Sequence, residues 1–251
     1  MIDFDVPYAL GALCYASYFV AEWLAPSWRA RLLGAGIAAH AAGLVVRAHA
    51  ISYFPLTNKF ESFYAFAFAA FAVCLLAARS PSRLHRLGIA LFGAAFYAAT
   101  LAFDRGVSFP PPLMVTPFYP LHVPASFFAY ALWVSAAADG LAVLCGPKVT
   151  DSNHRALERH AFWGWCTFSL SMIFGGAWGF VAWGAYFMWD PKVVWSVILW
   201  LFWSGFVHLR YWPEANRPRV KATLALVGVG VMLVAYVGTS FLFQHSSHSF
   251  R

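Results

Sequence analysis

Long apolar stretches separated by short polar segments make up almost the whole of this chain. They cover residues 6–25, 31–51, 60–78, 87–103, 121–146, 161–182, 193–212 and 221–243. A helix needs about 20 mostly apolar residues to cross a bilayer. Only helices and closed barrels satisfy their backbone polar groups in lipid, and barrel strands would be about 10 residues long and alternating. The pattern therefore predicts an all-α integral membrane protein, a polytopic bundle of about eight transmembrane helices, whose shortest member is the fourth.

The composition agrees with this pattern. The chain has 251 residues, of which 61% are hydrophobic and 11% charged, and its mean hydropathy is +0.64. Soluble domains average about 45–50% apolar and about 25% charged residues. The formal net charge is +7, but the basic residues fall in short loops and form no long run, which argues against nucleic-acid binding. No repeat or low-complexity linker divides the sequence, so we expect a single transmembrane domain over residues 1–251.

Lysine and arginine are distributed unevenly between the two ends of the predicted spans. With the N-terminus outside, twelve of these residues lie in inner loops and five in outer segments. Cytoplasmic loops carry the excess of positive charge in membrane proteins. We therefore expect both termini outside, with four segments on the outer face: "SYFPLTNKFESF" (52–63), "PPPLMVTPFYPLH" (110–122), "WGAYFMWDPKVVW" (183–195) and "FQHSSHSF" (243–250).

Tryptophan is concentrated around residues 183–195, here called the tryptophan segment. Nine of the twelve tryptophans lie between Trp163 and Trp212, whereas an interfacial belt would spread them over all span ends. Asp190 precedes a proline, which disfavours helical geometry at Asp190 and lets its side chain cap a helix that starts at Pro191. We expect a flat apolar platform held by that cap and formed by Trp183, Trp189 and Trp195.

Several histidines lie within the predicted spans or at their ends. His122 lies at the outer start of the fifth stretch, and His248 lies beyond the outer end of the eighth, with His245 three residues before it. Two imidazoles at one depth beside an aromatic surface suit axial ligation of haem iron, although a lone interfacial histidine is the commoner case. His208, toward the inner end of the seventh stretch, and His40, in the second, are ionisable groups within spans, which indicate function by default. For His40 we favour packing or hydrogen bonding.

The remaining histidines have simpler interpretations. His85, His154 and His160 lie among charged residues on the inner side, and we expect them to be solvated loop residues. His49, at the outer end of the second stretch, is expected to be an interfacial residue.

Segment 52–63 predicts a turn followed by a capped helix. Thr57 or Asn58 is suited to cap the third span. Lys59 and Glu61 are expected as charges at the membrane rim. A cation there would suit a haem propionate, but a simple helix cap explains the segment almost as well.

Taken together, these motifs resemble the CcsA/ResC family of cytochrome c biogenesis proteins, the integral-membrane half of the System II cytochrome c synthase. The family's tryptophan-rich WWD signature reads approximately W-G-x-Y-W-x-W-D-P-K-E-x-W, and here it stands as "WGAYFMWDPKVVW". "ISYFPLTNKFESFYAF", "LHVPASFFAYAL" and "HSF" also look like family segments, so the resemblance runs from about residue 40 to the end. Phe187 stands where the family has tryptophan, Val193 stands where it has glutamate, and His245 is an additional histidine.

The resemblance implies haem export and attachment. Haem b would be the substrate, held on the outer face and offered to the CxxCH motif of apocytochrome c, with a CcsB/ResB-type membrane protein as partner. By position, His122 and His248 look like the axial ligands, with His245 as the alternate, and His208 looks like an intramembrane ligand. The haem-binding loop would contain Trp183, Trp189, Asp190 and Trp195.

The family also implies a multi-pass protein of the bacterial cytoplasmic membrane, or of the thylakoid membrane in a plastid, working on the periplasmic or lumenal face. No residue here resembles a conventional general base or nucleophile. Two alternatives stay open: a haem exporter or chaperone without attachment activity, and a haem-binding subunit of a larger membrane complex.

Overall fold

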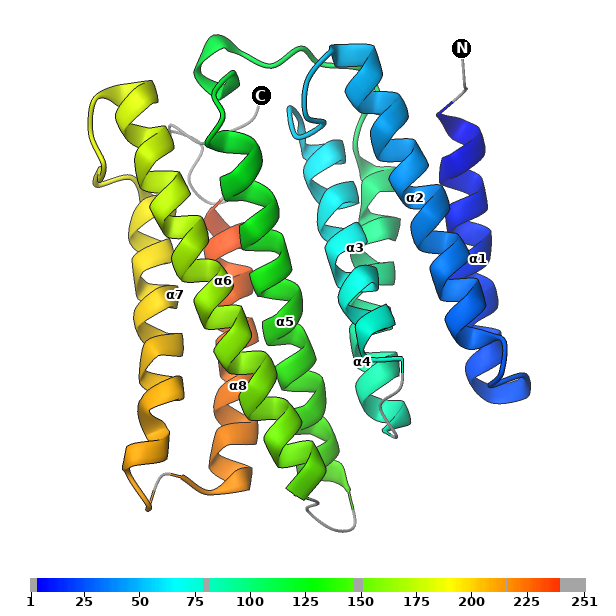
Figure 1. Cartoon of the computed structure of the whole chain (residues 1–251), viewed down its shortest axis with the longest axis vertical. Coiled ribbons are helices and arrows are strands. Elements are labelled where there is room, and N and C mark those ends of the chain that lie inside the picture. The colour runs from blue at the N-terminus through cyan, green and yellow to red at the C-terminus, as the bar shows by residue number, and fades with distance from the viewer. Residues whose placement is uncertain (1–3, 79–81, 147–150, 215, 240–251) are drawn as a thin grey trace. The chain divides into compact units, whose positions relative to one another are not determined.

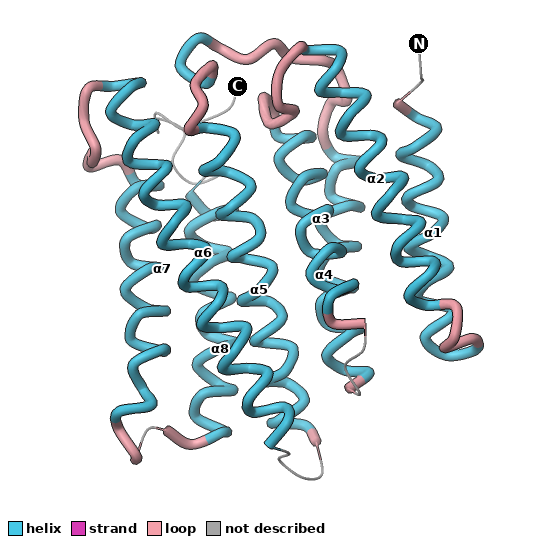
Figure 2. The backbone as a smooth tube through the Cα atoms, in the orientation of Figure 1, coloured by secondary structure: helices cyan, strands magenta, loops and turns pink. Residues whose placement is uncertain are grey.

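Helices make up most of this protein, and no strand occurs in the part of the chain that is described. The computed structural model describes residues 4–78, 82–146, 151–214 and 216–239. The chain divides into two compact units, Met1–Val115 and Thr116–Arg251. Figure 1 follows the helices in chain order, and Figure 2 shows the short loops that join them. The predicted all-α fold is confirmed, whereas the single domain over residues 1–251 and the outward position of both termini stay predictions.

The first unit contains four α-helices and two 3₁₀ turns within its described residues. They are α1 (Asp5–Leu24), α2 (Arg29–Ile51), α3 (Lys59–Leu76), α4 (Arg83–Ala99), η1 (Thr100–Ala102) and η2 (Pro112–Met114). Helix α1 packs on α2, and α3 packs on α4. Aromatic rings fill the space between helices: Tyr15 stacks on Phe71 with centroids 3.5 Å apart, and Tyr8 stacks on Tyr97 at 4.9 Å. This core is therefore built from tyrosine and phenylalanine as much as from aliphatic residues.

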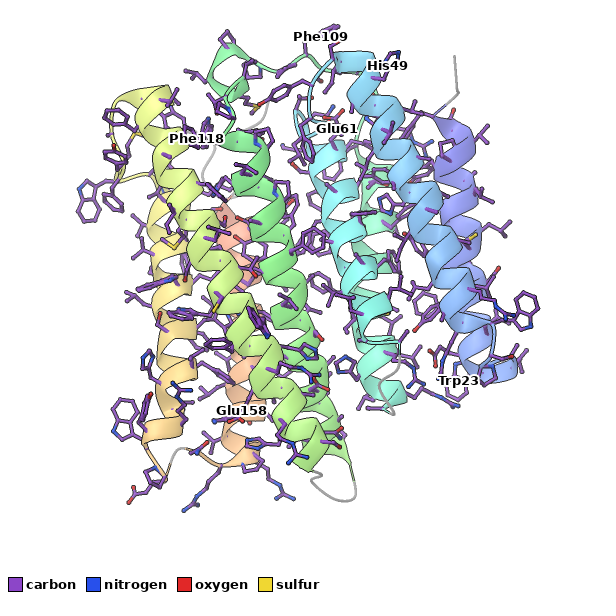
Figure 3. All side chains as sticks on the ribbon, in the orientation of Figure 1. Trp23, His49, Glu61, Phe109, Phe118 and Glu158 are labelled. Carbon is purple, nitrogen blue, oxygen red and sulfur yellow. The ribbon has the colours of Figure 1, made fainter. Side chains whose placement is uncertain are left out.

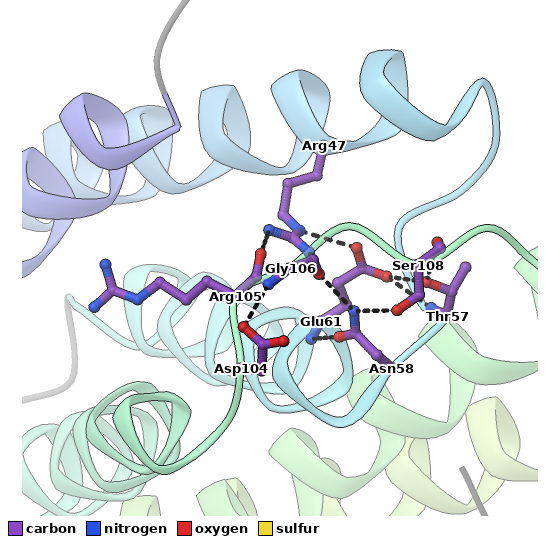
Figure 4. A network of polar contacts seen from close by, with 8 residues as sticks. All are labelled: Arg47, Thr57, Asn58, Glu61, Asp104, Arg105, Gly106 and Ser108. Carbon is purple, nitrogen blue, oxygen red and sulfur yellow. Dashed lines mark hydrogen bonds and ion pairs between the residues drawn. The ribbon is translucent and has the colours of Figure 1, made fainter. Parts of the chain in front are cut away.

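Two buried ion pairs join helices of the first unit. At one end, Arg86 of α4 donates to both carboxylate oxygens of Glu22 of α1, at 3.0 and 2.9 Å. At the other, Arg47 of α2 donates from Nε to Glu61 of α3 at 2.9 Å (Figure 4). Glu22 and Glu61 are fully buried. Glu61 is therefore a buried charge paired with an arginine from another helix, and the position of Lys59 and Glu61 at the membrane rim stays a prediction.

The second unit also contains four α-helices in its described residues. They are α5 (Tyr119–Cys145), α6 (Asp151–Trp183), α7 (Pro191–His208) with the 3₁₀ turn η3 (Leu209–Tyr211), and α8 (Pro218–Leu233), which continues as a π-helical turn, η4 (Val234–Gly238). Helix α5 packs against α6 and α8. Helix α7 also packs against α6 and α8. In the core, Trp133 of α5 stacks on Trp203 of α7, with centroids 4.7 Å apart and planes 3° from parallel.

Seven of the described helices, α2 to α8, are long and apolar enough to cross a membrane. Many large apolar side chains point away from the helices (Figure 3); Trp23 is one, with 62% of its surface exposed. Such surfaces suit lipid contact, so the protein is a multi-pass membrane protein. Helix α1 has the length but not the hydropathy, because Asp5, Glu22 and several tyrosines lower it. The short fourth span qualifies, because η1 extends it to Ala102.

Candidate functional site

The tryptophan segment is the connection between α6 and α7, and local chemistry sets both of its ends. Gly184 ends α6 with φ +74°, a left-handed conformation that favours glycine, and its N–H donates to Phe180 O at 2.9 Å. Asp190 is extended, at φ −84° and ψ 139°, and its carboxylate accepts the N–H of Lys192 at 2.9 Å. Pro191 is the first residue of α7. The predicted aspartate cap is therefore confirmed.

The loop folds back along the end of α6. Tyr186 stacks on Phe180 with centroids 4.6 Å apart. A Cβ built on Gly179 would lie 3.1 Å from Ala185 O, so the absence of a side chain there lets the loop backbone approach the helix. The end of α6 therefore supports the loop.

The tryptophans of the segment differ in exposure. Trp183 is half-buried and meets the edge of Trp178 of α6 at a centroid distance of 4.8 Å. Trp189 is 87% exposed, and its ring stands nearly perpendicular to Phe187 at 5.2 Å. Trp195 is half-buried on α7. The segment presents Trp189 and Phe187 outward and anchors Trp183 inward; the flat platform stays a prediction.

His122 lies in the first turn of α5, against α6. Its Nδ1 is 2.8 Å from Ser171 O. A carbonyl oxygen only accepts, so Nδ1 carries the proton and the neutral ring has its lone pair on Nε2. The ring stacks on Trp178, with centroids 6.2 Å apart and planes 22° from parallel. Trp178 touches Trp183 as well, so one indole joins His122 to the tryptophan segment.

His208 is the last residue of α7, and it is exposed; its position within the membrane stays a prediction. Its Nδ1 lies 2.7 Å from Ser204 O, which again assigns the proton to Nδ1 and the lone pair to Nε2. His122 and His208 therefore share the tautomer that leaves the Nε2 lone pair available, with Nδ1 held by a backbone carbonyl.

A reciprocal pair of hydrogen bonds fixes α7 against α6 near His208. Trp165 donates to Ser204 Oγ, and Trp200 donates to Ser169 Oγ, both at 2.8 Å. Each serine donates in turn to the carbonyl one helical turn earlier, that of Trp165 or Trp200, also at 2.8 Å. Interhelical hydrogen bonds of this kind hold helices together in lipid. We call these four residues the indole clasp.

His40 has a structural role. It is fully buried, its Nε2 lies 2.9 Å from Tyr64 O, and its Nδ1 lies 3.0 Å from the Tyr15 hydroxyl. Because the carbonyl accepts from Nε2, the Tyr15 hydroxyl donates to Nδ1. Both ring nitrogens are bonded within the protein, which confirms the interpretation of packing and hydrogen bonding. The predicted ligand His248 and its alternate His245 lie outside the described residues.

Sequence reasoning missed a buried pair in the second unit. His160 Nδ1 lies 2.8 Å from Asp139 of α5, and Asp139 is 1% exposed. His154 and His160 belong to α6, and His85 to α4, so the expectation that they are loop residues is wrong. Charged residues around them lower the local hydropathy, so hydropathy alone does not indicate that these segments are helical. The available signal was Asp139 itself, an acid inside an apolar span, which needs a partner.

Comparisons with known proteins agree on one family. A family model described as cytochrome C assembly protein matches residues 37–246. The cytochrome c biogenesis protein CcsA of Prochlorococcus marinus (strain AS9601) is 39% identical over 79 residues, 32% of this chain and 25% of that protein. The protein of the same name from Gloeothece citriformis (strain PCC 7424) is 26% identical over 255 aligned residues, 76% of this chain and 77% of that protein. The match thus spans a quarter of the length of the Prochlorococcus protein.

A solved structure has a similar fold. The structure described as cytochrome c heme lyase CcmF superposes with a TM-score of 0.62 at 15% identity, over 96% of this chain and 49% of that chain. At this identity the likeness concerns the fold alone, and this chain spans about half of the CcmF chain.

Proposed function

The chain belongs to the cytochrome c assembly protein family, and from that premise we propose that it acts in cytochrome c maturation by holding haem on the outer face of a membrane. Haem b is the proposed substrate. The membrane is the bacterial cytoplasmic membrane, or the thylakoid membrane in a plastid. Residues 1–251 act as one domain, with both termini and the tryptophan segment on the periplasmic or lumenal side.

One observation carries the proposal: Trp178 touches both His122 and Trp183. Haem needs a nitrogen donor for its iron and apolar aromatic walls for its ring. His122 supplies a neutral imidazole with its lone pair on Nε2, and the tryptophan segment supplies exposed aromatic surface in Trp189. The donor types and the apolar surroundings therefore fit haem. Trp195 and the Asp190 cap would complete the platform.

The remaining ligands follow from the family resemblance. His248, or His245 as the alternate, would take the second axial position opposite His122. His208 would receive haem within the membrane, with a counterpart from a CcsB/ResB-type partner. The apocytochrome would then present its CxxCH motif.

Attachment itself needs little chemistry from this chain. Each cysteine thiol adds across one haem vinyl double bond: a C–S bond forms, the C=C bond becomes single, and the thiol proton ends on the neighbouring carbon. The haem supplies the reactive vinyls. The residues described here would bind and orient haem, which lowers the entropic cost of bringing the two reactants together.

Imidazole rescue tests the role of His122. We expect His122→Gly to abolish maturation of a CxxCH reporter, because the iron loses its ligand, and added imidazole to restore part of it. Covalent haem on the reporter is measured by haem staining. Wild-type maturation by the variant would exclude His122 as a ligand.

Haem retention tests the tryptophan segment. Trp189→Ala and Asp190→Ala are expected to lower the haem absorbance of the purified protein, because one removes aromatic surface and the other the cap. Trp23→Ala is the matched control, since Trp23 is also exposed, at 62%, and lies on α1. Equal haem in all three variants would remove the platform from the account.

A second candidate function is delivery of haem without attachment. The observation that favours it is that described contacts of the tryptophan segment hold its structure: Asp190 caps α7, Trp183 packs on Trp178, and Tyr186 stacks on Phe180. Co-expression with a partner and a CxxCH reporter separates the two: covalent haem on the reporter indicates attachment, and free haem alone indicates delivery.

A further inference from the structure

A closed set of hydrogen bonds joins the start of α5 to α6 around His122. The Ser171 hydroxyl donates to His122 O at 2.9 Å and lies 3.1 Å from His122 Nδ1. Ser126, one turn after His122, has its Oγ 2.6 Å from Ser171 Oγ. Because Ser171 gives its only hydroxyl proton to the His122 carbonyl, Ser126 is the donor within the serine pair. Both serines are buried, so water does not replace these bonds if they are lost.

Gly175 provides the space that the imidazole occupies. A Cβ built on Gly175 would lie 2.7 Å from both Cε1 and Nδ1 of His122, well inside van der Waals contact. The next residue, Gly176, behaves differently: a Cβ there would lie 3.6 Å from Tyr186 O, an ordinary contact. Of these two adjacent glycines, only Gly175 is required by the position of the histidine ring.

The residues around the ring share one face of α6. Ser171, Gly175 and Trp178 follow one another at intervals of four and three, which places them in a row along the helix. The Ser171 carbonyl accepts from Nδ1, Gly175 leaves room for the ring edge, and Trp178 lies beside the ring in an offset, near-parallel arrangement. We call Ser171 and Gly175 the histidine notch.

We propose that the histidine notch positions His122 as an iron ligand by fixing both its tautomer and its ring orientation. This rests on the proposed function, in which His122 is an axial ligand. The Ser171 carbonyl holds the Nδ1 proton, so Nε2 is the ligating atom, and a ring that donates from Nδ1 is a more basic ligand. The missing side chain at Gly175 allows the imidazole to reach that carbonyl.

The two adjacent glycines give a matched test. Gly175 and Gly176 both lie within α6, so the change to alanine raises helix propensity by the same amount at each position. Gly175→Ala is expected to weaken haem binding at the His122 site by about 10- to 100-fold, the range for outer partners of ligating histidines. Its haem absorbance spectrum would also differ from that of wild type, and imidazole in the medium would restore the wild-type spectrum. Gly176→Ala is expected to keep the wild-type spectrum. Identical spectra for the two variants would overturn the proposal.

A second readout uses the haem-free protein. Nitrogen NMR of histidine-labelled protein reports which ring nitrogen carries the proton, and His122→Gly identifies the His122 signals. We expect the Nδ1–H tautomer in wild type and Gly176→Ala, and its loss in Gly175→Ala. A His122 ring protonated on Nε2 in wild type contradicts the notch. If wild type shows the expected tautomer but binds no haem, the proposed function fails and the positioning of His122 stands.

Discussion

Glu61 is expected to be a sensitive position in the first unit. Its carboxylate accepts from Arg47 Nε at 2.9 Å, from Thr57 N at 2.7 Å and from Thr57 Oγ1 at 2.8 Å. Glu61 is fully buried and Arg47 is 3% exposed. Glu61→Gln keeps the side-chain shape but removes the charge that balances Arg47. Removing one partner of a buried ion pair costs about 3–5 kcal/mol, because the other charge stays buried and uncompensated.

Further hydrogen bonds hold the Arg47 guanidinium in its buried position, so it cannot easily turn toward water when Glu61 is changed. Its Nη1 and Nη2 donate to the carbonyls of Arg105 and Gly106 at 2.9 and 3.1 Å, which ties the connection after η1 to α2 (Figure 4). Loss of Glu61 is therefore expected to loosen this connection as well. Arg47→Met combined with Glu61→Gln should cost less than the two single changes together, since no unpaired charge is left.

Unfolding by SDS titration in mixed micelles, followed by circular dichroism, measures the effect. The matched control is Asp5→Asn, which removes the pair between Asp5 and Arg105; these side chains are 68% and 39% exposed, at 3.2 Å. An exposed pair contributes about 0–1 kcal/mol. If Glu61→Gln destabilises no more than Asp5→Asn, the account of a stabilising buried pair is refuted.

The same titration checks two further predictions. Gly184→Ala should destabilise by about 1 kcal/mol because its φ is +74°, whereas Gly205→Ala, in open space within α7, should be neutral or stabilising; equal effects would contradict the left-handed cap. Ser204→Ala should cost about 1–3 kcal/mol by leaving the Trp165 N–H without its acceptor. Adding Trp165→Phe to Ser204→Ala should lower the free energy of unfolding little further, because both changes remove the same hydrogen bond. If the two losses of stability add up in the double variant, the indole clasp is contradicted.

Features set by neighbouring residues were predictable from the sequence. The eight helices follow from the apolar stretches, because a span of about 20 residues has few other solutions in lipid. Asn58 caps α3 by accepting from Glu61 N at 2.9 Å, and Asp190 caps α7, as the turn residues indicated. The resemblance to the CcsA/ResC family, drawn from short motifs, is confirmed by the family match.

Features set by tertiary packing were not predictable in this way. The ion pair of Glu61 was not predicted, because its partner Arg47 lies on another helix and the pairing depends on how α2 meets α3. Helix α6 begins at Asp151, ten residues before the apolar stretch 161–182, because its first three turns are polar and hydropathy alone does not report them. The histidine notch depends on how α5 meets α6, so Gly175 and Ser171 carried no signal of their own.

The haem content of the purified protein tests the central claim most directly. A pyridine haemochrome spectrum identifies the haem type and gives the amount bound per chain, for wild type and for His122→Gly. We predict a haem b spectrum in wild type and a clear loss in the variant that imidazole partly reverses. A wild-type chain purified without haem, or a variant that retains the full amount, would contradict the assignment of His122 and the tryptophan segment as a haem site.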